Sequence, residues 1–289
     1  MRSLLLLCLT CPTLAAALVA SEPRVARAAP PEDPVGTVRA TIREELGTAT
    51  PVVREGPFVL AGPGWTAGSL QSVATLVRQA LDALYADRFA TTPARPVAVY
   101  LFPSAQPYER FCRTRLGDPC ISPYGFYRPD FRTIVMNAGP GLGTLTHEMV
   151  HPLMEADFAS APTWIDEGIA SLFEAPVIPR HGEIHGVKNW RLPRLQSALR
   201  STRESEIARL DALFAMNDAT FRDGDESLHY ATARYVCQWL DGQGKLWPFY
   251  RAWRDDVAND PTGEKAFTRV MGEAPRDAND AWVAWVRRL

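Results

Sequence analysis

Two histidines and a glutamate within one short segment have the types and spacing that metal-dependent hydrolysis needs. His147 and His151 stand at positions i and i+4, and Glu148 directly follows the first histidine. On a helix these positions share one face, so both imidazoles can turn a nitrogen to the same metal ion. Glu148 is then better placed to reach a metal-bound water than to act as a ligand. The segment predicts a zinc site, because imidazole and carboxylate groups are ordinary zinc ligands.

A third ligand is needed, because a catalytic zinc ion takes three protein ligands and leaves one position for water. Glu167 follows His151 after a segment, residues 157–162, that we expect to form a turn between two helices. That layout brings Glu167 back alongside both histidines. In the alternative, the histidines and Glu167 are surface or core residues of amphipathic helices. We favour the metal site because the acidic residue follows at a workable distance and an apolar run packs its helix.

The stretch from His147 to Glu174 resembles the gluzincins, metallopeptidases that combine HExxH with a downstream glutamate ligand. Within them it looks most like the peptidase MA-like proteins, relatives of thermolysin and of the membrane-alanyl-type aminopeptidases. The second helix of that family carries NEG, and this chain has Asp166, Glu167 and Gly168 there. The likeness covers roughly residues 90–250 and is strong only over 145–174.

The resemblance implies a Zn2+ cofactor and a role for each matching residue. His147, His151 and Glu167 would be the zinc ligands, and Glu148 the general base. The family also has a tyrosine on a later helix that steadies the transition state. Tyr230, within the segment 228–236, holds the matching position.

One departure from the aminopeptidase branch bears on the activity. That branch carries Gly-x-Met-Glu-Asn, whose glutamate holds the free amine of the substrate. The comparable segment here, residues 132–137, ends in Val-Met-Asn, so it keeps a methionine and an asparagine but has neither the glutamate nor the glycine. We therefore expect an exported endopeptidase that hydrolyses peptide bonds in peptide or protein substrates. Two other classes stay open: a non-peptidase zinc amide hydrolase acting on cell-wall material, and a catalytically silent exported binding protein of the same fold.

The expected fold is α+β: a zincin, thermolysin-like catalytic domain with a small mixed sheet and a mostly helical C-terminal half. The domain would span residues 51–289, with the sheet and metal helices in 51–180 and the helical half in 181–289. Strands are predicted at 58–61 and 96–102, and a hairpin at 125–127 and 133–136. We expect strand 133–137 to line the cleft and pair with an extended substrate. Helices are predicted at 66–87, 106–115, from Thr144 onward, and at 191–200, 204–215, 226–241, 244–258, 262–271 and 277–288.

The N-terminus indicates export. A basic start, Met1-Arg2, precedes an apolar run to Ala20 that ends in small residues, which is typical of a secretory signal. We expect a signal peptide at residues 1–28, a flexible leader at 29–50, and a secreted or periplasmic protein without stable membrane insertion after signal removal. An uncleaved anchor is the alternative, which Pro12 disfavours. The net charge of −2 gives no reason to expect nucleic acid or an anionic membrane as a partner. The oligomeric state is left open.

Cysteine use agrees with export. Cys112 and Cys120 bracket a short polar loop and are predicted to pair in an oxidising compartment, with two free thiols as the alternative. Cys237 lies in an apolar helical run and is predicted to be a buried free thiol. Tryptophans at helix-like positions are predicted to be core residues rather than a carbohydrate platform: Trp239, Trp247, Trp253, Trp282 and Trp285.

The other histidines offer a rival metal site and an open question. His181 and His185 repeat the metal spacing, but Gly182 between them favours a loop near the cleft mouth. His229 is either a second hydrogen-bond donor beside Tyr230 or a residue that only caps its helix.

Overall fold

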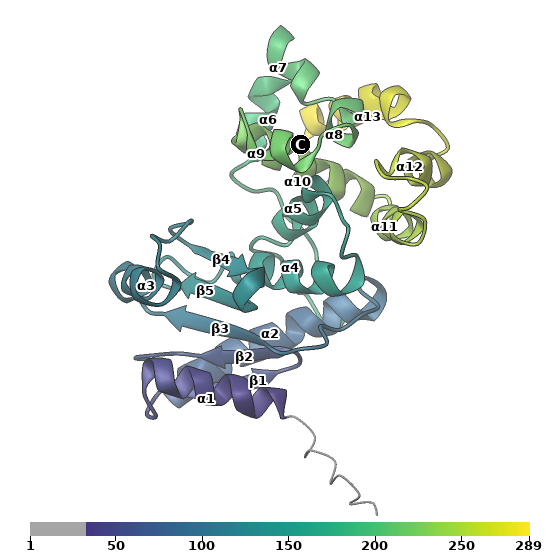
Figure 1. The fold of residues 1–289 in the computed structure, drawn as a ribbon. Coiled ribbons are helices and arrows are strands. Elements are labelled where there is room, and N and C mark those ends of the chain that lie inside the picture. The colour runs from purple at the N-terminus through teal and green to yellow at the C-terminus, as the bar shows by residue number, and fades with distance from the viewer. Residues whose placement is uncertain (1–32) are drawn as a thin grey trace, which may run out of the picture. The chain divides into compact units, whose positions relative to one another are not determined.

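The structure is a computed structural model that describes residues 33–289 (Figure 1). The first half of this chain contains a five-stranded mixed sheet. The spatial order is β1-β2-β3-β5-β4. The three central strands are parallel, and β1 and β4 lie antiparallel at the two edges. The strands are β1 (Val52–Glu55), β2 (Phe58–Ala61), β3 (Val97–Phe102), β4 (Gly125–Arg128) and β5 (Thr133–Asn137). The predicted strands and hairpin are confirmed, and β1 was not expected.

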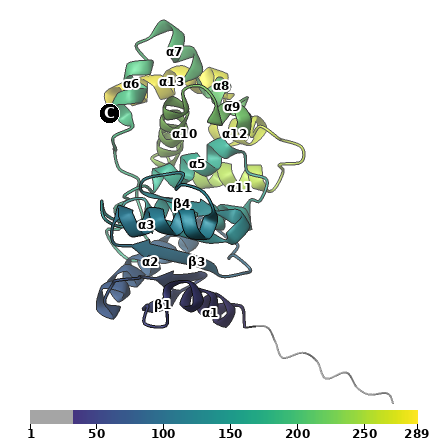
Figure 2. The same ribbon diagram turned by 60° about the vertical axis from the view of Figure 1, so that its left-hand side comes forward.

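Helices cover both faces of this sheet, because its side chains alternate between two hydrophobic cores. α1 and α3 pack on the face that carries Val59 and Tyr100. α2 and α4 pack on the face that carries Leu60 and Val99. Figure 2 shows α3 in front of the sheet and α2 behind it. These helices are α1 (Pro34–Leu46), α2 (Ala67–Asp87), α3 (Ala105–Phe111) and α4 (Leu145–Asp157).

Helix α1 corrects the prediction of a flexible leader over residues 29–50, which is wrong from residue 34 onward. The Asp33 carboxylate caps the helix by accepting a hydrogen bond of 2.9 Å from the backbone N–H of Gly36. Pro34 occupies the first turn, where its missing N–H costs nothing. Ile42 is fully buried against the sheet. The predicted signal peptide, residues 1–28, lies outside the described residues.

The second half of the chain is helical, so the α+β class with a small mixed sheet and a mostly helical half is confirmed. Helix α10 lies at its centre and packs on α5. No helix within residues 33–289 is long and apolar enough to cross a bilayer. The helices are α5 (Thr163–Leu172), α6 (Leu192–Ala198), α7 (Thr202–Ile207), α8 (Leu210–Phe214), α9 (Asp218–Arg222), α10 (Glu226–Asp241), α11 (Leu246–Arg254), α12 (Glu264–Met271) and α13 (Pro275–Arg288).

The predicted helix over 204–215 is wrong, because the chain breaks between α7 and α8. Arg209 is extended there, with φ −74° and ψ 151°. The N–H of the next residue, Leu210, donates to the side-chain oxygen of Asn279 at 3.1 Å instead of to a helical carbonyl. The short helix α9 was also not expected.

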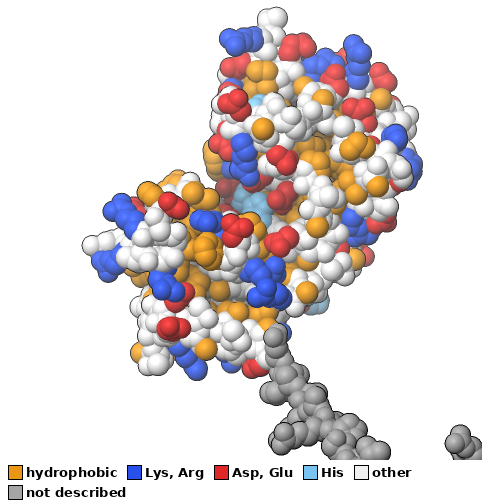
Figure 3. All heavy atoms as spheres, viewed as in Figure 1, with side chains coloured by type: hydrophobic (Ala, Val, Ile, Leu, Met, Phe, Trp, Pro, Cys, Tyr) orange, Lys and Arg blue, Asp and Glu red, His pale blue; other side chains and the backbone are white. Residues whose placement is uncertain are grey.

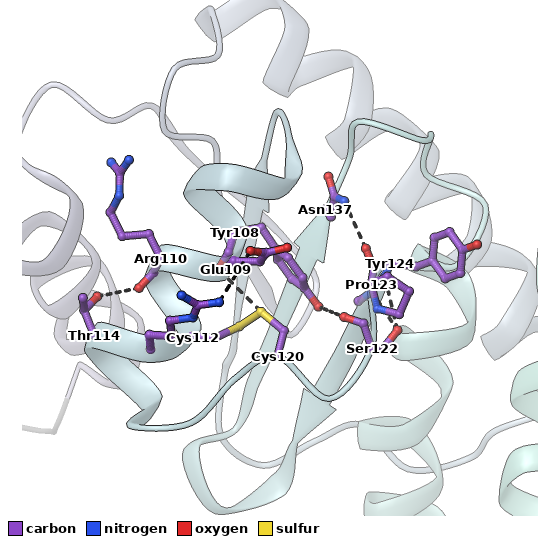
Figure 4. Close-up of a disulfide and its surroundings, with 12 residues drawn as sticks. Tyr108, Glu109, Arg110, Cys112, Thr114, Cys120, Ser122, Pro123, Tyr124 and Asn137 are labelled. Atoms are coloured by element: carbon purple, nitrogen blue, oxygen red, sulfur yellow. Dashed lines mark hydrogen bonds and ion pairs between the residues drawn. A yellow bond between two sulfur atoms is a disulfide. The ribbon is translucent and has the colours of Figure 1, made fainter.

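The cysteine and tryptophan predictions are confirmed. Cys112 and Cys120 form a disulfide that ties the end of α3 to the loop before β4 (Figure 4). Cys237 is a buried free thiol. Four of the tryptophans are buried and Trp285 packs partly buried against the same core, so none of the five forms an exposed platform.

Candidate metal centre

Two consecutive helices, α4 and α5, bring the predicted ligands together. His147 and His151 lie one turn apart on α4, and Glu167 lies on α5. The Oε2 atom of Glu167 is 3.4 Å from Nε2 of His147 and 3.9 Å from Nε2 of His151. Two ligands of a tetrahedral zinc ion are about 3.4 Å apart when each bond is about 2.1 Å long. The distance from Glu167 to His147 matches this spacing, and the distance to His151 is about 0.5 Å longer.

Two carboxylates compete for the place of third ligand. His147, Glu148 and His151 alone form a group that could hold a metal. However, the Oε2 atom of Glu148 is 4.0 Å from Nε2 of His151, slightly farther than that of Glu167. The Oε2 atom of Glu167 is also buried without a hydrogen-bond partner. Because a buried, unpaired carboxylate oxygen is costly, Glu167 is the better fit for a cation ligand, and Glu148 stands beside the group.

The second ring nitrogen of His151 is held by a residue outside the ligand group, whereas Nδ1 of His147 is buried without a hydrogen-bond partner among the described residues. Nδ1 of His151 lies 3.0 Å from the Asp166 carboxylate, which fixes the ring with Nε2 toward Glu167. Such carboxylate–histidine pairs commonly orient metal ligands. Burial lowers the pKa of His151, but Asp166 and Glu167 outweigh it and raise that pKa to about 10. No role was predicted for Asp166 from the sequence, although its position directly before Glu167 could have indicated one.

Charge balance differs between the two buried glutamates. Burial raises the pKa of the Glu148 carboxyl. Burial acts in the same direction on Glu167, but the two imidazoles and the guanidinium of Arg222 outweigh it and hold the pKa of Glu167 well below its usual range. Glu167 is thus the carboxylate that its surroundings keep charged.

Close packing of α5 on α10 places Glu167 next to Tyr230. A Cβ atom on Gly168 would lie 2.8 Å from the sulfur of Cys237 and 3.0 Å from the carbonyl oxygen of Ala233. Any larger residue at 168 would push the helices apart. The glycine that follows the predicted third ligand is therefore required for the packing of α5 on α10.

Arg222, which the sequence analysis missed, joins Glu167 to Tyr230. Its Nη2 donates to Oε1 of Glu167 at 2.6 Å, and its Nη1 donates to the hydroxyl of Tyr230 at 2.5 Å. Because the Tyr230 oxygen accepts this bond, its own proton is available to another acceptor. Arg222 ends the unexpected helix α9, and no local pattern in the sequence marks it.

The metal-ligand group lies in a cavity of about 1130 Å³ between the sheet and the helical half. Figure 3 shows histidine side chains at the bottom of this hollow, with acidic side chains beside them. Residues 121–127 line one side, and residues 189–191 together with Arg222, Glu226 and Tyr230 line the other.

The strand beside this cavity is not the predicted one. β5 is paired on both sides, with β3 and with β4, so it has no open edge for a substrate. β4 is the edge strand, and Gly125, Phe126 and Tyr127 line the cavity. The prediction that strand 133–137 pairs with a substrate is therefore wrong.

The remaining histidines lie outside the cavity lining. His181 and His185 are exposed and lie in the predicted loop, where His181 is 3.3 Å from Asp82. His229 is buried, and its Nδ1 lies 2.9 Å from the carbonyl oxygen of Phe221. His229 thus ties α10 to α9 and is not a second donor beside Tyr230.

Thr144 begins α4 as predicted, although its side chain makes no capping bond.

No family model matches this chain, and no curated protein matches it.

Proposed function

We propose that this protein is an exported zinc-dependent peptidase of the gluzincin type, with a thermolysin-like catalytic domain. His147, His151 and Glu167 would hold the Zn2+ ion. The observation that carries the proposal is the convergence of two imidazole nitrogens on a buried carboxylate oxygen that has no hydrogen-bond partner in the described part of the chain. Export is supported by the disulfide and by the composition of residues 1–28.

Two residues of the chain would handle the proton and the negative charge. A zinc ion bound here would lower the pKa of a water and polarise the scissile carbonyl. Glu148, buried beside the ligand group, would accept the proton of the attacking water and return it to the leaving amine. Tyr230, whose oxygen already accepts from Arg222, would donate its hydroxyl proton to the developing oxyanion.

The edge strand β4 favours an extended polypeptide as substrate. An exposed sheet edge binds extended chains through main-chain hydrogen bonds with little demand on sequence. β4 has a partner on one side only, and its residues line the cavity above the metal ligands. Together with the missing amine-binding glutamate, this supports an endopeptidase over an aminopeptidase.

The test pairs a metal measurement with an activity measurement on the exported form, residues 29–289. We expect about one equivalent of zinc and a casein hydrolysis that a chelator abolishes. Glu148→Gln is expected to keep the zinc and lose activity by about 10²–10⁴-fold, the usual contribution of a general base. Glu206→Gln, on the exposed face of α7, is the matched control and keeps full activity. Hydrolysis by Glu148→Gln at the wild-type rate, or no zinc even after its addition, would overturn the proposal.

A further inference from the structure

The guanidinium of Arg191 is held against aromatic rings at the cavity wall. Its central carbon is 4.2 Å from the ring centroid of Trp190 and 4.9 Å from that of Tyr230. The side chain is only 13% exposed and lines the cavity. A guanidinium is attracted to ring faces through its charge, so both rings stabilise this group.

In the described part of the chain, the N–H edge of this group donates no hydrogen bond, and its one ion-pair partner is Glu174. Its Nε atom is buried without a hydrogen-bond partner. The nearest carboxylate oxygen, Oε2 of Glu174, is 3.5 Å from Nε and already accepts from the side chain of Asn189. Within residues 33–289 the guanidinium donates no hydrogen bond, and only the backbone N–H of Arg191 does.

Arg222 shows what a satisfied guanidinium in the same cavity looks like. Its nitrogens donate to Glu167, Tyr230 and Glu226. Arg191 lies on the ring of the same Tyr230 but has none of these partners. Arg222 is therefore bound to the candidate ligand group, whereas the guanidinium of Arg191 donates no hydrogen bond within the described residues.

A carboxylate is the chemical group that matches these unused donors. A guanidinium presents a planar fork of N–H groups that fits a carboxylate with two parallel hydrogen bonds. Nε has no hydrogen-bond acceptor in this mostly buried place, and a bound anion would supply acceptors to the fork. Since Tyr230 touches both arginines, an anion at Arg191 would lie one side chain away from Arg222 and Glu167.

We propose that Arg191 forms an anionic subsite that binds a carboxylate of the substrate beside the scissile bond. This inference rests on the proposed peptidase function and narrows its substrates to peptides that carry a carboxylate at that place. The carboxylate comes either from an acidic side chain or from the C-terminus of the substrate. The exposed ring of Trp190 would cover the residue that bears it.

The experiment measures binding without turnover, on the zinc-loaded Glu148→Gln protein. The probes are versions of one acetylated alanine hexapeptide with a central phenylalanine. One pair has a C-terminal acid or amide, and a second, amidated pair has glutamate or glutamine beside the phenylalanine. We expect at least one pair to differ in Kd by about 10-fold or more, as for hydrogen bonds to a charged group. A difference in the first pair identifies a C-terminal carboxylate, and one in the second an acidic side chain.

Adding Arg191→Gln is expected to reduce the difference in Kd within that pair to less than about 2-fold. Arg191→Lys is expected to retain part of the difference, because lysine keeps the charge without the planar fork of N–H groups. Arg269→Gln, an exposed arginine on α12, is the control that keeps it. If Arg191→Gln lowers the melting temperature strongly, the lysine variant carries the test. Equal affinities within both pairs, no binding of any carboxylate probe, or a full difference in both Arg191 variants would overturn the subsite.

The two proposals fail separately. If the protein prefers carboxylate probes through Arg191 but hydrolyses no peptide, only the proposed peptidase function is contradicted. If the protein is a zinc-dependent peptidase whose rates do not depend on substrate carboxylates, only the proposed subsite at Arg191 is contradicted.

Discussion

The floor and the walls of the cavity are built in different ways. The floor comes from α4 and α5, two neighbouring helices on which His147 and Glu167 are buried and the side chain of His151 is 13% exposed. The walls come from the disulfide-tied loop before β4 on one side and from residues 189–191 and α9 on the other. Large apolar side chains are exposed there, among them Ile121, Tyr124 and Trp190. The candidate metal ligands therefore come from two helices that are neighbours in the sequence, and the walls come from segments far apart in it.

Removing a ligand from the floor is expected to have the largest effect. In Glu167→Gln the carboxylate that faces both imidazoles becomes a neutral amide, so zinc affinity should fall by about 100-fold or more and hydrolysis with it. A competition titration against a chromogenic chelator measures the affinity. Glu109→Gln, an exposed glutamate on α3, provides the comparison. If the Glu167 variant keeps its affinity for zinc, the third ligand would be Glu148 instead of Glu167.

Tyr230 lies where floor and wall meet, and it should affect the reaction without affecting the metal. Tyr230→Phe removes the proposed oxyanion donor and keeps the ring on which Arg191 packs. We expect kcat to fall by about 10²–10³-fold with zinc affinity unchanged. Steady-state kinetics with metal analysis separates the two quantities. A variant that keeps the wild-type kcat would assign Tyr230 a packing role only.

The end of α4 is pinned by Asp157, which makes the floor sensitive to acid. Burial raises the pKa of Asp157, but hydrogen bonds from Arg254, Thr91 and Tyr250 outweigh it and lower that pKa. Stability from a depressed carboxyl pKa is present above the unfolded pKa, near 3.9, and is lost as the pH falls through the folded value.

Asp157→Asn should therefore lower the free energy of unfolding by about 3 kcal/mol at pH 7, and by less as the pH falls below about 4. Urea denaturation at pH 7 and at pH 3 measures this. A destabilisation that is equal at both values would contradict the ionised role of Asp157.

Removing the disulfide, which lies in the wall, is expected to have a smaller effect than the changes to the floor. It anchors a loop whose carbonyl oxygens accept hydrogen bonds from Tyr108, at Ser122, and from Asn137, at Pro123 (Figure 4). Replacing both Cys112 and Cys120 by serine should lower the free energy of unfolding by about 2–3 kcal/mol. Because the loop leads into β4, KM for a peptide should rise a few-fold while zinc affinity stays constant. A loss of zinc would show that wall and floor are coupled.

The difference between floor and walls also explains what the sequence could predict. His147, His151 and Glu167 follow from the spacing of one helix and the next, so their meeting could be foreseen. Strand positions could be foreseen too, from β-branched and apolar runs. Strand order could not, because pairing is set by long-range packing, so the sequence does not show that β5 is paired on both sides and that β4 is the edge strand.

The missed elements were of two kinds. α1 had a readable signal in the capping residue Asp33 and the following Pro34, which the proline-rich surroundings obscured. α9 has only a five-residue span, so neither its helix nor the direction of Arg222 follows from periodicity. Arg191 likewise depends on rings from separate segments, Trp190 and Tyr230. Residues that meet only through tertiary contacts need the structure.

The proposed zinc site is tested most directly by a crystal structure of the zinc-loaded protein with anomalous data collected at the zinc edge. We expect one strong peak, bonded to Nε2 of His147, Nε2 of His151 and a carboxylate oxygen of Glu167 at about 2.0–2.2 Å, with Glu148 outside the coordination shell. A peak coordinated by Glu148 in place of Glu167, or no peak at this group, would contradict it.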